Sequence, residues 1–414
     1  MHDLVIYGGK CWIDKKLVEC CIALDGNKIS YIGKEDVKGE VNLNAKNCIV
    51  LPAFFNAHTH AAMTLLRGVA EGVPFYEWLN NVQMLERDLR DEDVYWGSLL
   101  ACLEMIKNGV AAFSDMYIYM DSVAEAVIEA GMRAALGYGM ADRGNPDRAE
   151  EELKEGIRFA EKWNDFSRIT TFLAPHAPYS CSPEFLKKIS EYDYLKHIHV
   201  SETLWEVKEI KKRYGTTPVK LLNEIGFLDS KTVAAHCVWL NEEEIKILSE
   251  KGVSVAHCPA SNMKLGAGIA KIREMIDRNV NVCLGTDGAA SNNNLNILHE
   301  MRIAALLQLL RKKPLKAVEI MKMATENGYK AYKINGGRIE VEKLADLVVL
   351  KKDVSSYPFG DENSIVFASI GCEANHLIVD GRIVMEDREI LTLNEEKVLS
   401  QAEKRARRLI SKFS

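Results

Sequence analysis

Val50-Leu51-Pro52-Ala53-Phe54-Phe55-Asn56-Ala57-His58-Thr59-His60 is an apolar string that opens into two histidines. A short apolar run of this kind is typical of a strand that is buried on both faces, as the strands of a parallel sheet are. Side-chain direction repeats every two residues along a strand, so His58 and His60 lie on the same face. The stretch therefore predicts a buried strand that ends in a pair of imidazoles.

Seven similar apolar strings follow along the chain, and amphipathic stretches separate them. Counting the first string, the candidate strands end at Asn56-Ala57-His58, Phe113-Ser114-Asp115, Leu136-Gly137-Tyr138, Leu173-Ala174-Pro175-His176, Ile198-His199-Val200, Ala234-Ala235-His236, Val255-Ala256-His257 and Leu284-Gly285-Thr286-Asp287. The candidate helices include Asp91 to Lys107, Ala149 to Trp163 and Asn241 to Lys251. This alternation predicts an α/β protein built as a parallel (β/α)8 TIM barrel.

The sequence pattern at the two ends of the chain is different and predicts short strands joined by tight turns. Leu4 to Tyr7 precedes a Gly-Gly pair, and similar strings return at Asp346 to Leu350 and at His376 to Met385. We expect both ends to build one small β domain, and Glu395 to Lys412 to form a closing surface helix. The predicted units are a composite β domain at 1–51 and 340–393, a TIM-barrel domain at 52–339 and a C-terminal helix at 394–414.

Composition excludes several classes of partner. The net charge of -6 argues against binding to a nucleic-acid backbone, which requires a basic face. No segment approaches the roughly 18 consecutive apolar residues of a membrane span, and the N-terminus lacks the pattern of a secretory signal. We therefore expect a cytoplasmic protein that has no nucleic-acid or membrane partner. Independently of composition, we expect it to be a homo-oligomer.

The ten cysteines are scattered and show no C-x-x-C spacing. Such a pattern favours free, mostly buried thiols in a reducing compartment over a disulfide frame or a zinc knuckle. The cysteines are Cys11, Cys20, Cys21, Cys48, Cys102, Cys181, Cys237, Cys258, Cys283 and Cys372.

Chemistry in a TIM barrel lies at the C-terminal ends of the strands, and three later strands end in His199, His236 and Asp287. One buried histidine is more often a satisfied core residue than a ligand. Together with His58 and His60, however, these residues form a donor set that suits zinc, with iron or manganese as alternatives. The combination predicts a metal site at the rim of the barrel.

Several motifs carry a resemblance to a known family. They are Pro52–His60 followed by Met63–Gly68, His199-Val200-Ser201-Glu202, Ala235-His236-Cys237, His257–Asn262 and Gly285-Thr286-Asp287-Gly288. In these motifs the chain resembles the deaminases of the amidohydrolase superfamily. Within that group it is similar to the methylthioadenosine and S-adenosylhomocysteine deaminases, of which the 5′-deoxyadenosine deaminases are a close variant. The resemblance covers nearly the whole chain.

The resemblance implies that His58, His60, His199 and Asp287 ligate one divalent ion per chain. Zn²⁺ is the expected ion, and Fe²⁺ and Mn²⁺ are the alternatives. Members with two ions carry a bridging, carboxylated lysine at the end of the fourth strand. This chain has His176 there, so we expect a mononuclear site.

The resemblance also implies hydrolytic deamination of an adenosine-type nucleoside, giving the inosine analogue and ammonia. 5′-Deoxyadenosine, methylthioadenosine, S-adenosylhomocysteine and adenosine are the candidate substrates, which would place the enzyme in the salvage of S-adenosylmethionine by-products. A bound divalent ion lowers the pKa of water to about 7, and Asp287 and His236 are expected to deprotonate and hold that water. Glu202 is expected to protonate the purine ring nitrogen beside the reacting carbon and then to assist the departure of ammonia.

The sugar and the base have expected contacts as well. By resemblance Glu86 holds the ribose diol and His176 contacts the sugar, while Glu202 and Asp287 face the reacting ring. Trp78 is either a cover for the base or a core residue of its helix. Three other polar residues are expected to support the ligands or to lie deeper in the barrel, namely Asp115, His257 and His197.

The expected contacts of the 5′ substituent depart from the pattern of the resembled family. Members that accept S-adenosylhomocysteine meet its carboxylate with two arginines, one of them at the end of the third strand. Tyr138 stands at that position here, and Arg148 is the candidate for the second arginine. We therefore expect a preference for a compact, neutral 5′ group.

Two other classes of function remain open at this point. A relative with the same frame could act on guanine, cytosine or a chlorinated ring, and a barrel could also persist as a non-catalytic scaffold. The cytidine-deaminase type of zinc site, with His-x-Glu followed by Pro-Cys-x-x-Cys, is excluded because neither element occurs in the chain.

Overall fold

Eight parallel strands form the central sheet of the molecule, and they lie side by side in the order in which they occur along the chain. The computed structural model describes residues 1–35, 37–352, 354, 357–358, 360–369 and 374–411. The strands are β8 (Phe54–Thr59), β9 (Val110–Tyr117), β10 (Arg133–Met140), β11 (Ile169–Pro175), β12 (Leu195–Val200), β13 (Thr232–His236), β14 (Ser254–His257) and β15 (Asn281–Leu284). The predicted α/β class and the TIM-barrel architecture are confirmed.

The barrel closes where the end of β15 approaches β8. The backbone N–H groups of Thr286 and Asp287 donate to the His58 carbonyl at 3.1 and 2.9 Å. Gly285 makes this approach possible, because a Cβ atom there would lie only 2.8 Å from the backbone nitrogen of His58. Strand closure therefore brings His58 and Asp287, residues far apart in the sequence, next to each other at the rim.

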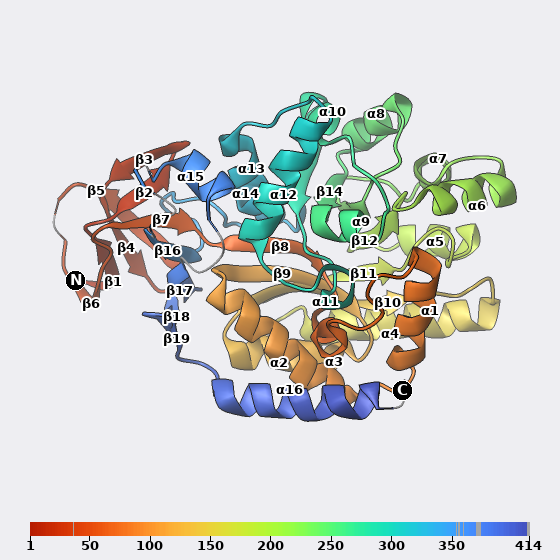
Figure 1. Cartoon of the computed structure of the whole chain (residues 1–414), viewed down its shortest axis with the longest axis horizontal. Helices are drawn as coiled ribbons and strands as arrows, with labels where there is room; N and C mark the ends of the chain where they lie inside the picture. The colour runs from red at the N-terminus through yellow and green to blue at the C-terminus, as the bar shows by residue number, and fades with distance from the viewer. Residues whose placement is uncertain (36, 353, 355–356, 359, 370–373, 412–414) are drawn as a thin grey trace.

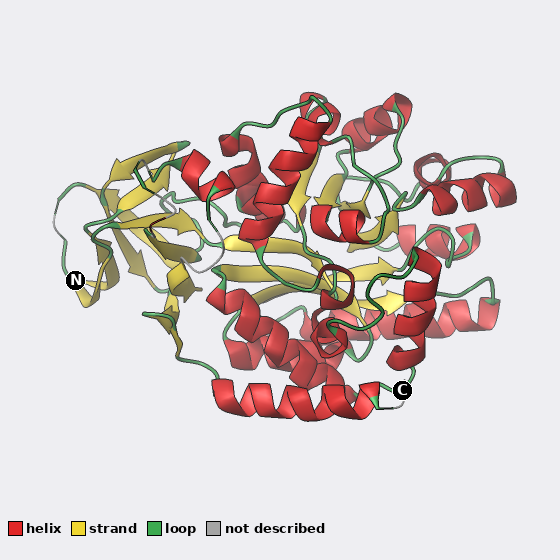
Figure 2. Cartoon of the chain, in the orientation of Figure 1, coloured by secondary structure: helices red, strands yellow, loops and turns green. Residues whose placement is uncertain are grey.

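Helices cover the outside of the barrel (Figure 2). They are η1 (Ala61–Leu66), α1 (Phe75–Glu86), α2 (Asp91–Lys107), α3 (Met120–Ala130), α4 (Pro146–Trp163), α5 (Pro183–Ser190), α6 (Leu204–Tyr214), α7 (Pro218–Glu224), α8 (Glu242–Lys251), α9 (Pro259–Lys264), α10 (Ile272–Asp277), α11 (Ala289–Asn292), α12 (Ile297–Leu310), α13 (Ala317–Ala324) and α14 (Glu326–Ala331). Helix α2 has the predicted bounds. Helix α4 begins earlier than predicted, because the Asn145 side chain caps its first turn and Pro146 occupies the first helical position.

A β domain lies at one end of the barrel, on the left in Figure 1. Its sheets have the strand orders β5-β4-β1-β6 and β19-β18-β17-β16-β7-β2-β3. Its strands are β1 (His2–Tyr7), β2 (Lys10–Ile13), β3 (Lys16–Glu19), β4 (Cys21–Asp25), β5 (Lys28–Gly33), β6 (Gly39–Asn44), β7 (Cys48–Pro52), β16 (Leu347–Lys351), β17 (Ala374–Val379), β18 (Arg382–Glu386) and β19 (Glu389–Ile390), whereas α15 (Glu362–Phe367), between β16 and β17 in the chain, packs against α12 and α13 of the barrel. Strand β7 pairs with β16, so both chain ends build the domain as predicted, while the residue limits given above stay a prediction.

A buried charge cluster connects the β domain to the barrel. Arg133, at the start of β10, donates to Asp346 at 2.9 Å and to Asp380 at 2.8 Å. The Tyr329 hydroxyl donates to the same Asp346 carboxylate at 3.0 Å. Burial opposes the charge of Arg133, but the two carboxylates outweigh it and raise the pKa of the guanidinium. The cluster therefore holds strands from three distant parts of the chain together.

The C-terminal helix α16 (Glu395–Ile410) runs along the base of the view in Figure 1 and packs against α2. Arg405 pairs with Glu92, and Arg408 pairs with Asp93. The helix begins where it was predicted to begin. Lys412, where the prediction ended it, lies outside the described residues.

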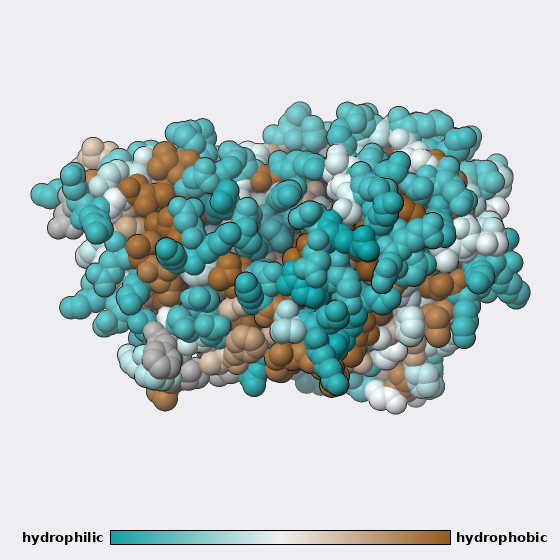
Figure 3. All heavy atoms as spheres, turned by 90° about the horizontal axis from the view of Figure 1, so that it is seen from above, coloured by the Kyte–Doolittle hydropathy of each residue, from teal (hydrophilic) through white to brown (hydrophobic). Residues whose placement is uncertain are grey.

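The surface and the cysteines agree with an ordinary globular protein. Polar side chains cover most of the face in Figure 3, and apolar atoms are scattered among them. No helix in the described ranges has the length and apolar content needed to cross a membrane. Eight of the nine described cysteines are buried, the exception being Cys20, and Cys372 lies outside the described residues.

Candidate functional site

Five polar side chains converge at the C-terminal rim of the barrel, and four of them are the predicted metal ligands. They are His58 on β8, His60 directly after it, His199 on β12, His236 at the end of β13 and Asp287 just after β15. Asp287 Oδ1 lies 3.6 Å from His58 Nε2 and 3.4 Å from His60 Nε2. His58, His199 and His236 form a second group whose ligand atoms all lie within 4.8 Å of one another. The rim therefore brings together the residues that the strand-end pattern singled out.

Hydrogen bonds fix the orientation of two of these imidazoles. His60 Nδ1 lies 2.7 Å from the Met116 carbonyl, and His199 Nδ1 lies 2.7 Å from the His176 carbonyl. A carbonyl oxygen only accepts, so Nδ1 carries the proton in both rings. The Nε2 atoms of His60 and His199 consequently keep their lone pairs and face the common site.

The other two imidazoles are held by side chains. His236 Nδ1 lies 2.9 Å from the amide oxygen of Asn262, and His58 Nδ1 lies 3.0 Å from His197 Nε2. His58 Nε2 is buried and finds no hydrogen-bond partner among the residues that the structure describes. A buried polar atom without a partner costs free energy, and a cation at the rim would satisfy it. The His58 side chain therefore fits a metal site.

Electrostatics separates the roles of the histidines. Burial, and then the neighbouring imidazoles, lower the pKa of His58 and of His199, so both are neutral and can act as ligands. Burial also lowers the pKa of His236, but the carboxylates of Glu202 and Asp287 outweigh it and raise that pKa. His236 thus binds a proton more readily than His58 and His199 do.

Three hydrogen bonds hold the Asp287 carboxylate in place. The hydroxyls of Ser261 and Ser291 donate to Oδ2 at 2.6 and 2.8 Å, and the backbone N–H of Gly288 donates to Oδ1 at 2.7 Å. Burial opposes ionisation of Asp287, but His60, His236 and these hydroxyls outweigh it and lower the pKa. Asp287 is therefore a preorganised carboxylate.

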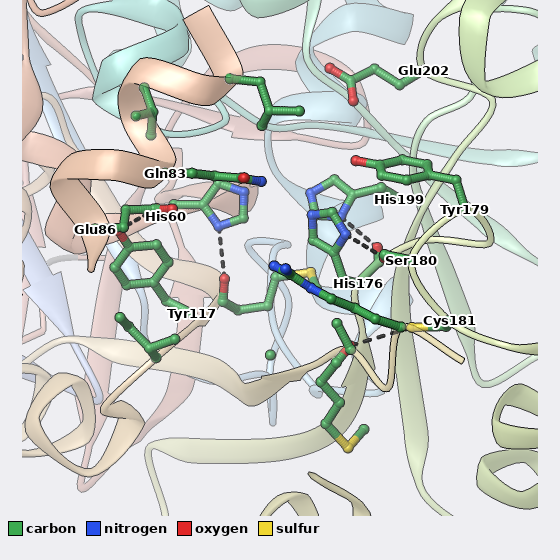
Figure 4. A pocket seen from close by; sticks show the side chains of 18 of the residues that line it. His60, Gln83, Glu86, Tyr117, His176, Tyr179, Ser180, Cys181, His199 and Glu202 are labelled. Carbon is green, nitrogen blue, oxygen red and sulfur yellow. Dashed lines mark hydrogen bonds between the residues drawn. The ribbon is translucent and has the colours of Figure 1, made fainter. Parts of the chain in front are cut away.

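Glu202 lies just beyond the end of β12. It lines a cavity at the rim of the barrel, which His60, His199 and Asp287 also line. Figure 4 shows Glu202 and Glu86 on opposite sides of the imidazoles of His60 and His199. Burial raises the pKa of Glu202, although the positive charge of His236 partly offsets this. Glu202 therefore keeps a proton more readily than an exposed glutamate does.

The carboxylate of Glu206, a residue outside the predicted site, holds the backbone around Glu202. Glu206, in the first turn of α6, accepts from the N–H groups of Ser201 and Glu202, both at 2.9 Å. Thr203 caps the same helix and accepts from the Glu206 N–H at 3.2 Å. The Thr-x-x-Glu spacing of a helix capping box could have identified Glu206 from the sequence.

Left-handed backbone conformations recur at the rim. Ser201, His236 and Asp287 have φ values of 51°, 68° and 63°. Such conformations are strained for residues with a Cβ atom and persist only when the surroundings hold them. At these positions the bend turns each strand end toward the site.

The cavity at this rim has a volume of about 810 Å³. His60, His199, His236 and Asp287 form one wall of it. The predicted substrate contacts Glu86, His176 and Trp78 also line the cavity, so the structure brings them to the candidate metal site. Helix α1 supplies Glu86 and Trp78, and the end of β11 supplies His176. The volume is large enough for a nucleoside-sized ligand.

Glu86 is fixed by a residue that the sequence did not reveal. The Tyr117 hydroxyl donates to Glu86 Oε1 at 2.6 Å, as the dashed line in Figure 4 marks. Burial raises the pKa of Glu86, and this hydrogen bond partly offsets the increase. Tyr117 follows Asp115 by two residues and so shares its face of the strand, which is the only sequence signal for it.

His176 and Trp78 are also held in place. His176 Nδ1 bonds to the Ser180 hydroxyl at 2.7 Å, and burial lowers the pKa of His176 to about 4. The Trp78 indole N–H donates to the Ala290 carbonyl at 3.2 Å. Trp78 therefore packs as a buried residue and presents one side to the cavity.

The end of β10, the loop that follows it and the first turn of α4 form another side of the cavity. Tyr138 and Arg148 both line it, as expected for the region of the 5′ group. Arg148 is paired with Glu152 at 3.0 Å, and Arg143 from the same loop also lines the cavity. The positive charge of Arg148 is therefore partly neutralised.

Three further predicted residues lie behind the ligands. Asp115 Oδ1 accepts from the N–H of Ala61 at 3.2 Å, and burial raises the pKa of Asp115 to about 7. His257 is buried, and its pKa is lowered to about 3 for the same reason. His197 lies inside the barrel below His58, as the sequence suggested.

Comparison with known proteins now identifies the class. A TIM barrel whose rim gathers histidines and one aspartate is typical of metal-dependent hydrolases. The Amidohydrolase family matches residues 49–384, which is most of the chain. The chain therefore belongs to the amidohydrolase family.

Particular relatives are similar over nearly their whole length. A 5-methylthioadenosine/S-adenosylhomocysteine deaminase 2 of Archaeoglobus fulgidus is 56% identical and covers 99% of this chain and 100% of its own. A 5′-deoxyadenosine deaminase of Methanocaldococcus jannaschii is 44% identical, with 92% and 94% covered. The crystal structure of a Xanthomonas campestris adenosine deaminase with bound zinc has a TM-score of 0.95 at 28% identity and covers 99% of both chains.

Proposed function

We propose that this protein is a metal-dependent hydrolase that deaminates adenosine-type nucleosides to the inosine analogue and ammonia, in the salvage of S-adenosylmethionine by-products. The observation that carries the proposal is that His60, His199, Asp287 and Glu202 line one nucleoside-sized cavity, with the remaining predicted ligand His58 next to His60 and Asp287. Relatives named as 5′-deoxyadenosine and methylthioadenosine/S-adenosylhomocysteine deaminases support it.

One divalent ion would be held by His58, His60, His199 and Asp287. The unpartnered Nε2 atom of His58 and the outward Nδ1 hydrogen bonds of the other imidazoles support this set. Such an ion supplies Lewis acidity and lowers the pKa of water from about 15.7 to about 7. Zn²⁺ is the proposed ion because the donors suit it and the zinc-containing adenosine deaminase has a similar fold.

The acid and the base are two carboxyl groups in different surroundings. Asp287, held by hydroxyl and N–H donors, is the group that takes a proton from the attacking water. Glu202, which is buried, holds a proton and donates it to the ring nitrogen next to the carbon under attack. Protonation of the ring avoids a localised anion as that carbon becomes tetrahedral, and the same carboxyl then assists the departure of ammonia.

The remaining contacts orient the substrate. Glu86 accepts from the ribose diol, because Tyr117 occupies only one of its carboxylate oxygens. His176 contacts the sugar, and His236 holds the water on the other side of the ring. Trp78 covers part of the base.

Glu86 favours this function over the related alternatives. A guanine or cytosine deaminase or a chlorohydrolase has no ribose diol to bind, so a buried carboxylate in the cavity would be a cost to it. A non-catalytic scaffold would gain nothing from the unpartnered His58 Nε2.

Ammonia release from adenosine analogues, measured after controlled loading with Zn²⁺, Mn²⁺ or Fe²⁺, tests the proposal. We expect activity with about one bound ion per chain, and loss of both metal and activity in His60→Ala. Activity without metal, or two ions per chain in the active form, would contradict the metal assignment. Release from guanine or cytosine but not from any nucleoside would contradict the substrate assignment.

We further propose a homo-oligomer in the cytoplasm. Exposed leucines near the end of α12, namely Leu306, Leu309 and Leu310, offer an apolar contact for assembly. Sedimentation analysis of the purified protein, compared with a Leu309→Lys variant, tests this assembly.

A further inference from the structure

A chain of buried hydrogen bonds runs from the candidate metal site down into the barrel. His58 Nδ1 lies 3.0 Å from His197 Nε2, and His197 Nδ1 lies 2.7 Å from the Tyr332 hydroxyl. That hydroxyl lies 2.9 Å from the carbonyl of Ala57, on the same strand as His58. The three side chains His58, His197 and Tyr332 are at most 1% exposed, so water does not compete for these bonds.

The donor in each of these hydrogen bonds can be assigned by starting from the Ala57 carbonyl. The Ala57 carbonyl only accepts, so the Tyr332 hydroxyl donates to it. The Tyr332 oxygen then accepts from Nδ1 of His197, which leaves Nε2 of His197 as an acceptor. His58 must therefore donate from its Nδ1, and its Nε2, which faces the site, keeps a lone pair.

We propose that His197 and Tyr332 are positioning residues that hold His58 in the tautomer able to bind a metal ion. The proposal rests on the metal site of the proposed function and extends it to side chains that do not contact the ion. It makes Tyr332, at the end of α14 and 274 positions after the proposed ligand His58, part of that site.

Loss of these hydrogen bonds would change the tautomer of His58. Without an acceptor at its Nδ1, His58 gains nothing from keeping the proton there, and the tautomer with a proton on Nε2 becomes populated. That tautomer cannot ligate a metal, so the apparent affinity for the ion falls by the fraction of competent rings. Partners of this kind typically change metal affinity by about 10- to 100-fold.

The residues around this set of hydrogen bonds allow substitutions at His197 and Tyr332 and a matched control. Tyr332→Phe removes only the hydroxyl. The His197 ring lies 5.4 Å from Phe172 and 6.1 Å from Tyr332 between ring centroids, so a phenylalanine ring at position 197 keeps aromatic neighbours. Tyr329 provides a matched control. It is equally buried and packs on the same Phe55 ring as Tyr332, but its hydroxyl donates to Asp346, outside the chain.

The experiment measures Zn²⁺ affinity of the full-length protein by competition with a chromogenic chelator, together with the visible spectrum of the Co²⁺-loaded form. We expect affinity to fall by about 10- to 100-fold in His197→Phe and by less in Tyr332→Phe, with an altered Co²⁺ spectrum in both. Tyr329→Phe should lose stability but keep the wild-type affinity and spectrum. His197→Gln should recover much of the affinity, because its amide can accept from His58 and donate to Tyr332.

Each outcome decides one question. Equal affinity in Tyr332→Phe, His197→Phe and wild type would overturn the positioning role, and so would an equal loss in Tyr329→Phe, which would indicate a general effect of packing. Tight metal binding by a wild-type protein that deaminates no nucleoside would contradict the proposed function and leave the positioning role intact.

Discussion

Glu202 differs from an ordinary surface glutamate because burial stabilises its protonated form. If it donates the proton to the ring, Glu202→Gln should retain fold and metal but lower turnover by roughly a hundredfold or more. Single-turnover ammonia release at saturating substrate, with metal content measured on the same sample, checks this. Glu191→Gln, a change on the exposed end of α5, is the control. A Glu202→Gln enzyme with nearly wild-type turnover would show that another group supplies the proton.

Tyr138 determines the expected preference at the 5′ position. A carboxylate tail there meets a neutral phenol and Arg148, whose charge Glu152 already partly neutralises. Loss of one charge contact weakens binding by roughly 1.5–3 kcal/mol, or about ten- to a hundredfold. We therefore expect 5′-deoxyadenosine or methylthioadenosine to be used better than S-adenosylhomocysteine, which is still accepted.

The values of kcat/KM for the three substrates, measured on one metal-saturated preparation, test this preference. Tyr138→Arg should improve S-adenosylhomocysteine selectively, whereas Tyr138→Gln, which adds no charge, should not. A wild-type preference for S-adenosylhomocysteine, or no gain in Tyr138→Arg, would refute the explanation.

At the level of elements, the junction of β12 and α6 depends on the protonation of Glu206. Burial raises the pKa of this carboxyl from 4.5 to about 8, so the folded protein binds a proton that the unfolded chain has released. Between these pH values the folded state binds more protons than the unfolded state, and stability falls as pH rises. The contribution of Glu206 to the free energy of unfolding is therefore fully present below about pH 4.5 and is lost progressively as the pH rises to about 8.

Urea unfolding of the metal-free protein from pH 5 to 8 measures this effect. Glu206→Gln should reduce the dependence of the free energy of unfolding on pH by up to about 1.4 kcal/mol per pH unit, the value for one proton. A change at a half-buried glutamate on the same helix, Glu209→Gln, should leave the slope unchanged. Identical slopes in wild type and Glu206→Gln would show that Glu206 is ionised in the folded protein.

The elements themselves were largely predictable, and their mutual contacts were not. The apolar strings and the 91–107 helix follow from local periodicity, which the structure retains. The ligand positions followed because parallel strands end at one rim, so His58 and Asp287 had to lie near each other. Tyr117, Asn262 and Tyr332 could not be predicted, because their roles depend on which side chain of a different element they reach.

At the scale of the whole molecule, Arg133 joins the barrel to the β domain. Its side chain is 4% exposed and bonds to two carboxylates, of which Asp346 is fully buried. Arg133→Ala would leave those carboxylates unpaired and should lower the free energy of unfolding by about 3–5 kcal/mol. Denaturant unfolding followed by far-UV circular dichroism checks the change.

Arg158 is the matched control for this prediction. It also bonds to two carboxylates, Asp121 and Glu155, but its side chain is 42% exposed. Arg158→Ala should therefore change stability by about 1 kcal/mol or less. Similar losses in the two variants would show that the buried cluster has no special part in joining the domains.

The pairing of β7 with β16 has a consequence during synthesis of the chain. Pro52 lies opposite Leu347, so roughly 300 residues must leave the ribosome before β7 meets this neighbour. At about 5–20 residues per second, translation of that interval takes roughly 15 to 60 seconds. Throughout this time the nascent chain carries an apolar strand with one edge open, the arrangement most prone to pairing with another chain. The barrel, whose strands pair with their sequence neighbours, can form in the meantime, so β7 is made early but is among the last strands to gain both of its neighbours.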